Sequence, residues 1–235
     1  MRVTVRHSPE IEEVTIVIVG VFTPGIMSPF WFSFHGLVST REAEEATVTL
    51  MTPELTQIDF GWGRFYADQQ RIQVSTSQSP WVRASDLISK MLSEVLPGTT
   101  CRAVGINVSM DYPVTAEQRE SLGQKLAPRD AWGNWGKRLN NADPTKPSNG
   151  LTLITMRQGS DLENPYNKYV DVSVKSSNIL KPYGISIYIN DHYSYMDEPD
   201  SSVNSEIAAK TLASEFEKSL ERSHSIAEEI MQGVE

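Results

Sequence analysis

The stretch that decides the fold is TQIDFGWGRFYADQQRIQVSTS, residues 56–77. Its apolar residues alternate with polar or small ones in two places, namely at Ile58, Phe60 and Trp62, then at Ile72 and Val74. Alternation with a period of two is typical of a strand that buries one face. We therefore expect a strand that runs through Trp62, a polar turn at residues 67–70, and a returning strand that contains Ile72.

The same order of elements recurs about 112 residues further along the chain. In the first half the patterns predict strands at 14–22 and 47–51, the hairpin described above, and helices at 28–38 and 79–96. In the second half they predict strands at 102–112, 151–156, 169–175 and 184–191, a helix at 115–126, and a long final helix capped by Ser201 or Ser202. We infer two units of α+β class, residues 1–100 and 101–235, each ordered β-α-β-β-β-α.

The two predicted units are expected to pack together as one globule. Each unit alone would expose a sheet face or an apolar helix stripe, so the halves should share a core. One such stripe, which must be covered, consists of Phe30, Trp31, Phe34 and Leu37. This plan, with two antiparallel sheets packed by helices, resembles the TATA-binding-protein-like folds, and a likeness of plan carries no function.

Several residues predict where helices begin and where a loop lies. Ser28 before Pro29 is a typical helix start, and Ser39 with Glu42 and Thr115 with Gln118 have the spacing of capping boxes. Residues 140–150 combine Asn, Pro, Ser and Gly, which predicts an exposed loop.

Composition narrows the classes of partner. The chain has 21 Lys and Arg against 30 Asp and Glu, a net charge of −9, which disfavours binding to nucleic acid. No apolar run approaches the roughly 20 residues of a membrane span, and the run at 14–22 lacks the basic flank of a signal peptide. We therefore expect no membrane partner and a cytoplasmic location.

Neither a metal nor a cofactor is predicted. Cys101 is the single cysteine, which excludes an intramolecular disulfide and a Cys-rich metal site. We expect it to be a small buried residue at the start of a strand. His7, His35 and His224 are scattered without the spacing of metal ligands.

The best polar cluster is Asn190-Asp191-His192-Tyr193 at the end of a predicted strand. One interpretation makes Asp191 the group that orients His192 as a general base. However, adjacent residues of a strand point to opposite faces, and no nucleophile is placed to complete a site. The other interpretation is a polar strand end that enters a loop, with a His192 pKa near its usual value.

Two further groups of aromatic residues are candidates for ligand binding. Trp132 and Trp135, followed by basic residues, could stack a ligand, seat a partner protein or cover the core. Trp62 and Arg64 lie among glycines within a strand pattern, which favours a bend or a close backbone approach over a phosphate loop.

Three short stretches together resemble a family of uncharacterised bacterial proteins. The stretches are PGIMSPFW at 24–31, RAVGIN at 102–107 and NDHY at 190–193. The likeness spans most of the chain in the same order. No activity is established for that family, so the resemblance implies no catalytic residue.

Two hypotheses of function follow from the sequence. The first is a non-enzymatic binding or protein-interaction protein that assembles as a homodimer, because broad sheets with long helices offer contact surface and no catalytic set is complete. The second is an enzyme or small-ligand-binding protein with a cleft between the units, near Trp62, Arg64, Asp191 and His192. A flat apolar patch would favour the first, and a cleft lined by perturbed titratable groups the second.

Overall fold

The computed structural model describes residues 7–139, 149–159, 167–195 and 203–234, and it has the expected α+β class. The strands are β1 (Ile11–Gly20), β2 (Thr47–Met51), β3 (Leu55–Asp59), β4 (Arg64–Asp68), β5 (Arg71–Thr76), β6 (Thr100–Tyr112), β7 (Leu153–Gly159), β8 (Asn167–Ser176), β9 (Ile185–Ser194) and β10 (Val203–Asn204). The α-helices are α1 (Pro29–Phe34), α2 (Thr40–Glu45), α3 (Val82–Lys90), α4 (Ala116–Leu126), α5 (Gly133–Gly136) and α6 (Ser205–Met231). Shorter turns are η1 (Pro24–Ile26), the π-helical η2 (Met91–Val95), η3 (Arg129–Trp132) and η4 (Gln232–Val234).

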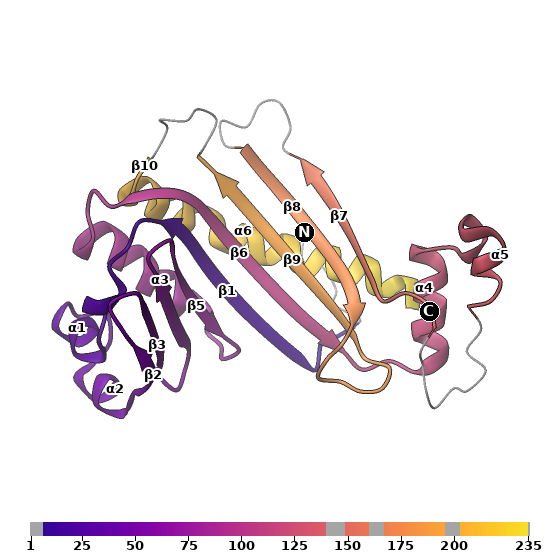
Figure 1. Cartoon of the computed structure of the whole chain (residues 1–235), viewed down its shortest axis with the longest axis horizontal. Coiled ribbons are helices and arrows are strands. Elements are labelled where there is room, and N and C mark those ends of the chain that lie inside the picture. Colours follow the sequence, from indigo (N-terminus) through magenta and orange to yellow (C-terminus); the bar gives the residue numbers. More distant parts are fainter. Residues whose placement is uncertain (1–6, 140–148, 160–166, 196–202, 235) are drawn as a thin grey trace.

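All nine longer strands belong to one antiparallel sheet, ordered β2-β3-β4-β5-β1-β6-β9-β8-β7, and β10 pairs with the start of β6. The expected pair of separate sheets is therefore wrong. The halves join because β1 pairs with β6 along its whole length, with Val14 opposite Val108 and Ile16 opposite Ile106 (Figure 1). β-branched residues fill β1, and Val104, Ile106 and Val108 of β6 lie opposite them, which suits this central position.

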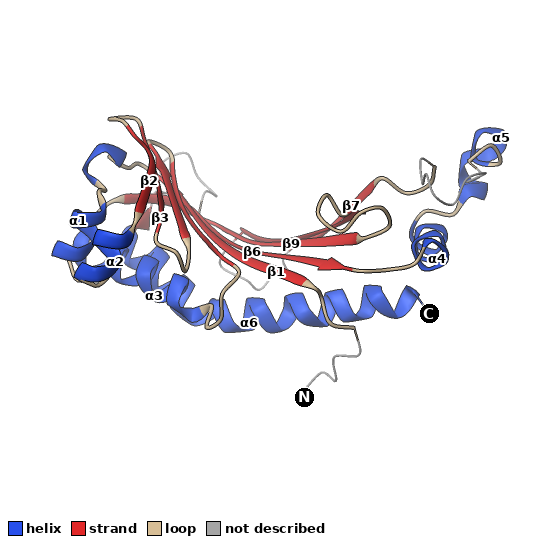
Figure 2. Ribbon diagram, turned by 90° about the horizontal axis from the view of Figure 1, so that it is seen from below, coloured by secondary structure: helices blue, strands red, loops and turns tan. Residues whose placement is uncertain are grey.

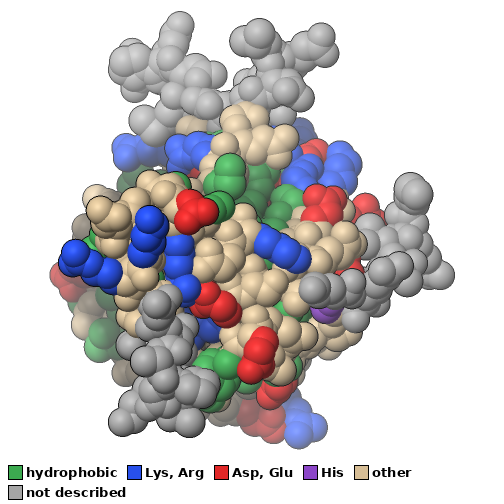
Figure 3. Space-filling view, turned by 90° about the vertical axis from the view of Figure 1, so that its right-hand side faces the viewer, with side chains coloured by type: hydrophobic (Ala, Val, Ile, Leu, Met, Phe, Trp, Pro, Cys, Tyr) green, Lys and Arg blue, Asp and Glu red, His purple; other side chains and the backbone are tan. Residues whose placement is uncertain are grey.

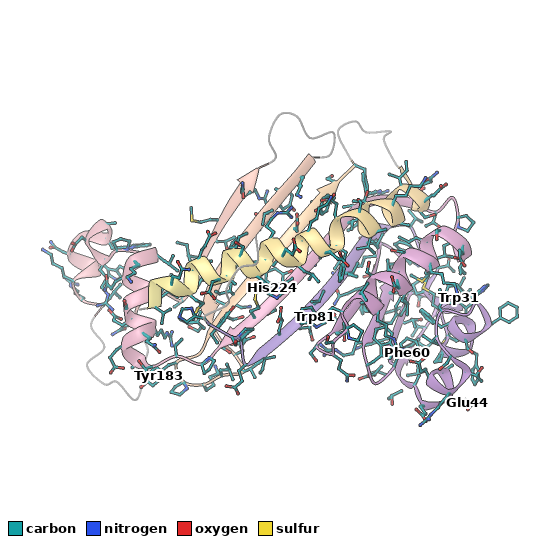
Figure 4. The ribbon with its side chains drawn as sticks, turned by 180° about the vertical axis from the view of Figure 1, so that it is seen from behind. Trp31, Glu44, Phe60, Trp81, Tyr183 and His224 are labelled. Carbon is teal, nitrogen blue, oxygen red and sulfur yellow. The ribbon has the colours of Figure 1, made fainter. Side chains whose placement is uncertain are left out.

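The helices that pack on the sheet lie on one of its faces. Figure 2 shows α3 and α6 below the sheet, and the same side is seen from behind in Figure 4. The buried residues of this face alternate along β1 and β6; they are Val14, Ile16, Ile18, Val104, Ile106 and Val108. They meet the apolar side of α6, where Ala208, Leu212 and Phe216 are buried. A continuous core therefore runs beneath both halves of the sheet.

Two aromatic rings link α3, α6 and the sheet. Trp81, just before α3, packs against His224 of α6 with ring centroids 5.8 Å apart (Figure 4). The Nε2 atom of His224 lies 2.6 Å from Oε1 of Glu12 on β1. These contacts fix the position of α6 across the strands that it covers.

The first helix buries less than its apolar stripe predicts. Of the predicted stripe, Trp31 and Leu37 pack half-buried against the core. The buried ring of the helix is Phe32, which contacts Phe60 at 5.3 Å and Phe65 at 4.7 Å. Phe30 is 67% exposed and Phe34 is 86% exposed, so the expectation that they are covered is wrong. The reason is that α1 has six residues and packs through one side.

The hairpin at 56–77 contains one more strand than expected. The predicted strand through Trp62 ends at Asp59, because Gly61 has φ of +81° and its N–H donates to Oδ1 of Asp59 at 2.7 Å. A backbone bond of 3.0 Å from Phe60 to Gly63 closes this turn. The chain then forms β4, whose last two residues fall in the predicted turn at 67–70, so the first half has one strand more than the order β-α-β-β-β-α.

Most helix starts are confirmed. The Ser28 hydroxyl accepts from the N–H of Trp31, and the Ser39–Glu42 and Thr115–Gln118 capping boxes are both present. By contrast, α3 begins at Val82 and not at residue 79, and α6 is capped by Asn204 and not by Ser201 or Ser202. Ser201 and Ser202, and residues 140–148 of the predicted loop, lie outside the described residues.

Two predictions from composition concern the burial of Cys101 and the lack of a membrane-spanning segment. Cys101 is fully buried near the start of β6, as predicted, and burial raises the pKa of its thiol to about 11. Within the described ranges, every helix is too short or too polar to cross a membrane.

Truncation of Phe32 tests the aromatic core. We expect Phe32→Ala to lower the free energy of unfolding by about 3–5 kcal/mol, because it removes a buried ring and leaves a cavity. The matched control, Phe34→Ala, removes an exposed ring of the same helix and should change it by no more than about 0.5 kcal/mol. Urea unfolding of both variants measures the difference, and equal losses would contradict the assignment of the two rings.

Candidate functional site

The face of the sheet opposite α6 is the first candidate site, and we call it the open face. Figure 1 looks onto this face, and Figure 2 shows that it lies on the inner side of the curved sheet. Strand pairing places on it Arg64, Tyr66, Gln73, Ser75, Glu13, Thr15, Val17, Gly105, Asn107, Tyr188, Asn190, His192, Tyr169, Asp171 and Arg157. Its central strands therefore present amides, hydroxyls and rings.

Three arginines of the open face are paired with carboxylates. Arg64 reaches from β4 to Glu13 of β1. Arg71 lies 3.1 Å from Asp68, and Arg157 lies 2.6 Å from Asp171. The hydrogen bond from Arg157 lowers the pKa of the Asp171 carboxyl. The face is thus close to neutral, although the chain as a whole is acidic.

The polar side chains at the centre of the open face hold one another in place. The Tyr188 hydroxyl donates to Oδ1 of Asn107 at 2.9 Å, and Nδ2 of Asn107 donates to the carbonyl of Thr15 at 3.2 Å. These bonds connect β9, β6 and β1. Burial raises the pKa of the Tyr188 hydroxyl, so this group remains a neutral donor at physiological pH.

His192 lies on the open face within β9. Its ring stacks on Tyr169 of β8 with centroids 4.5 Å apart, and the Arg157 guanidinium lies 3.8 Å from the Tyr169 ring centroid. Burial lowers the pKa of His192, with a further lowering from Arg157, while Asp171 and Asp191 act to raise it. The prediction of a pKa near the usual value assumed a solvated strand end, whereas His192 lies within β9 and is partly buried, which favours a lower pKa.

Asp191 faces the opposite side, as strand alternation predicts, and is fully buried against α6. It bonds to Arg222 of α6, and the Tyr193 hydroxyl donates to its Oδ2 at 3.3 Å. Lys168 of β8 lies 3.7 Å from Oδ1 of Asp191 and 3.0 Å from the Tyr193 hydroxyl. With Glu215, which lies 3.3 Å from the same hydroxyl, these residues form what we call the Asp191 network.

The Asp191 network links the sheet to α6. Burial raises the pKa of Tyr193, as do Asp191 and Glu215. Burial also lowers the pKa of Lys168, against the opposing effect of Asp191. Because Asp191 and His192 lie on opposite faces, they do not form a carboxylate–histidine pair.

The other sequence candidates lie in two separate places. Trp62, in the turn before β4, packs against Phe60, and the Arg83 guanidinium lies 4.1 Å from its ring centroid. This ring lies beside the aromatic core, whereas Arg64 lies on the open face. Trp132 and Trp135 lie at the far end of the molecule, 58% and 57% exposed, with ring centroids 5.6 Å apart.

A pocket of about 610 Å³ lies beside Trp132 and Trp135. It is bordered by α4, by the segment from η3 to Leu139, by residues 149–152, and by the neighbouring ends of β7, β8 and β9. Figure 3 faces this end of the molecule and shows Lys and Arg side chains gathered on its left. All residues that line the pocket belong to the second half of the chain, so it does not lie between the two predicted units.

Most residues of the open face are not marked by any motif in the sequence. Tyr169 and Tyr188 carry no motif, and the short stretches that contain Asn107 and Asn190 did not show that these residues share one face of the sheet. The signal that could have found them is the polar half of the same alternation that predicted the strands.

Comparison with protein-family models and with curated proteins finds no match to the chain. The resemblance to an uncharacterised bacterial family therefore stays a prediction. Across the described ranges, no group of three or more His, Cys, Asp or Glu side chains could hold a metal ion.

The Asp191 network is tested by removing its buried charge. We expect Asp191→Asn to lower the free energy of unfolding by about 3 kcal/mol, because Arg222 loses its carboxylate partner in a mostly buried setting. The control, Glu45→Gln, breaks the exposed pair with Arg41 and should cost no more than about 0.5 kcal/mol. Denaturant unfolding gives both values, and an Asp191→Asn loss as small as the control would refute the role of the network.

The titration of His192 tests its environment. NMR of the ring against pH should give a midpoint below the reference value of 6.5. Folded His192 binds its proton more weakly than the unfolded chain does. Its contribution therefore lowers the free energy of unfolding as pH falls through about 6.5, and levels off below the folded midpoint.

Arg157→Gln should raise the His192 midpoint, because it removes a positive charge that lowers this pKa. Arg64→Gln, at another paired arginine of the open face, is the control and should leave the midpoint unchanged. A wild-type midpoint at or above the reference value would contradict the burial of the ring.

Proposed function

We propose that the chain is a non-enzymatic protein-interaction protein that binds its partner through the open face. The observation that carries this proposal is the composition of the face. Solvated sheet faces are usually rich in Lys and Glu. On strands β5, β1, β6 and β9 the centre of this face has mainly Tyr, Asn, Ser, Thr, Gln and Gly, and Glu13 of β1 is paired with Arg64. Lys and Glu are depleted at protein interfaces, where Tyr is enriched, and Tyr, Ser, Gly and Asn are typical of antibody binding loops.

The fixed conformation of these side chains also supports binding. Tyr188, Asn107 and the Tyr169–His192 stack are held by contacts within the face. Asn107 is itself buried and supports the Tyr188 hydroxyl, so a partner would meet the rings of Tyr188, Tyr169 and His192. Their conformational freedom is already reduced, which lowers the entropic cost of association. The paired arginines add polar recognition without a net charge that must be neutralised.

We infer that the partner is a second copy of the chain, so that the protein forms a homodimer through the open face. We also infer that the halves are copies of one unit, a relation supported by their strand orders. These orders are β1-β5-β4-β3 on one side of the central pair and β6-β9-β8-β7 on the other. Each half of the chain would then supply one half of the open face.

The alternative is an enzyme or small-ligand-binding protein with a cleft between the units. Its four candidate residues do not converge, because Asp191 and Trp62 pack among buried side chains while Arg64 and His192 lie on the open face. This separation favours the interaction hypothesis.

Affinity capture with matched variants tests the proposal. Tagged wild-type chain, Tyr188→Ala and Phe34→Ala are each applied to an extract of the cells that encode the protein. Loss of the Tyr188 ring should reduce the recovery of a specific partner about tenfold, as for a central interface residue. Phe34→Ala removes a more exposed ring outside the open face and should leave recovery unchanged.

Sedimentation of the purified variants over a range of concentrations separates self-association from binding of another protein. A homodimer through the open face should be weakened by Tyr188→Ala alone. Capture or dimerisation that is insensitive to Tyr188→Ala but lost in Phe34→Ala would place the interface on α1 and overturn the proposal.

A further inference from the structure

The pocket beside α4 has the size and lining of a small-molecule site. Its volume of about 610 Å³ falls within the range of roughly 300–1,000 Å³ that holds drug-sized ligands. Apolar side chains come from every wall of the pocket, and they are Leu122, Leu139, Leu151, Leu153, Val174 and Ile185. Figure 4 shows Tyr183, another lining residue, beside α4 at this end of the molecule.

Two exposed tryptophans border this pocket. Trp132 and Trp135 contact each other at an angle of 53° and leave more than half of their surface in water. Exposed indole surface is costly, and a flat apolar group bound between the rings and the pocket would cover it. The aromatic pair thus favours a ligand with a ring system.

Arg119 supplies a fixed positive group in the same pocket. Its guanidinium donates to the carbonyl of Pro182 at 3.2 Å and to Oγ of Ser176 at 2.6 Å. Both acceptors are neutral, so they orient the guanidinium without cancelling its charge. Arg129, also in the lining, is instead paired with Glu120 at 2.6 Å. Since a guanidinium has five N–H donors, Arg119 keeps donors that match a carboxylate.

The charge around the pocket is opposite to that of the whole chain. The charged residues that line it are three basic and two acidic; they are Arg119, Arg129 and Lys175, against Glu117 and Glu120. Figure 3 shows Lys and Arg side chains on this end of the molecule, with Asp and Glu side chains among them. In a protein with a net charge of −9, such a local excess favours an anionic ligand at this position.

We propose that this pocket binds a small amphipathic anion, a molecule with a flat apolar ring system and one carboxylate. The rings lie against Trp132, Trp135 and the apolar lining, and the carboxylate accepts hydrogen bonds from Arg119. Binding is non-covalent and independent of the open face, so the two proposals are tested separately.

Three probes of the same shape and different charge test the ligand class. Calorimetric titration compares naphthoate, naphthylmethanol and naphthylmethylammonium, one positional isomer throughout. We expect wild-type chain to bind the anion at least about tenfold more tightly than the alcohol and to bind the cation most weakly. Equal affinities for the three probes, or no binding of naphthoate, would overturn the proposal.

Variants of the pocket residues test where naphthoate binds. Trp135→Ala and Trp132→Ala, at exposed positions, should each weaken naphthoate binding about tenfold. Arg119→Gln should remove the preference for the anion and retain binding of the alcohol. The matched control, Arg64→Gln, removes an arginine from the open face and should change neither affinity.

Thermal unfolding of each variant confirms that it is folded. If Arg119→Gln does not fold, the tryptophan variants still decide, because naphthoate binding that is unchanged in both of them would contradict the location.

Discussion

The antiparallel pairing of β1 with β6 is the interaction on which the rest of the structure depends. It joins strands from the two halves of the chain at the centre of one sheet, with Val14, Ile16 and Ile18 on the helical side. Burial of each such side chain contributes about 1.5–3 kcal/mol. Because both strands place their apolar residues on the same face, α6 must cross that face. The alternate residues are then left on the other face, which no described helix covers.

The strand pattern predicted much of this fold, because alternation reports burial directly. It located β8, β9 and the central strands. The spacing of Ser39 with Glu42 and of Thr115 with Gln118 separately located the two capping boxes. It could not show that Gly61 adopts a positive φ and ends β3, because a glycine in a strand pattern is also compatible with a bend. Nor could it show that the two halves share one sheet, since this depends on pairing between distant segments.

The candidate site was less predictable than the fold. The sequence singled out Asp191 and His192 as neighbours, and alternation correctly separated them onto two faces. However, the partners that define each residue come from other elements, Arg222 from α6 and Tyr169 from β8. A motif search finds adjacent residues, whereas a sheet face is assembled from single residues on many strands.

Hydroxyl-radical footprinting of the chain, alone and in complex with a captured partner, tests the central claim most directly. The radical oxidises exposed aromatic side chains, so each ring reports whether the partner covers it. If the open face is the binding surface, Tyr66, Tyr169 and Tyr188 become protected while Phe30 and Phe34 stay reactive. Protection confined to Phe30 and Phe34, with the three tyrosines unchanged, would contradict the account.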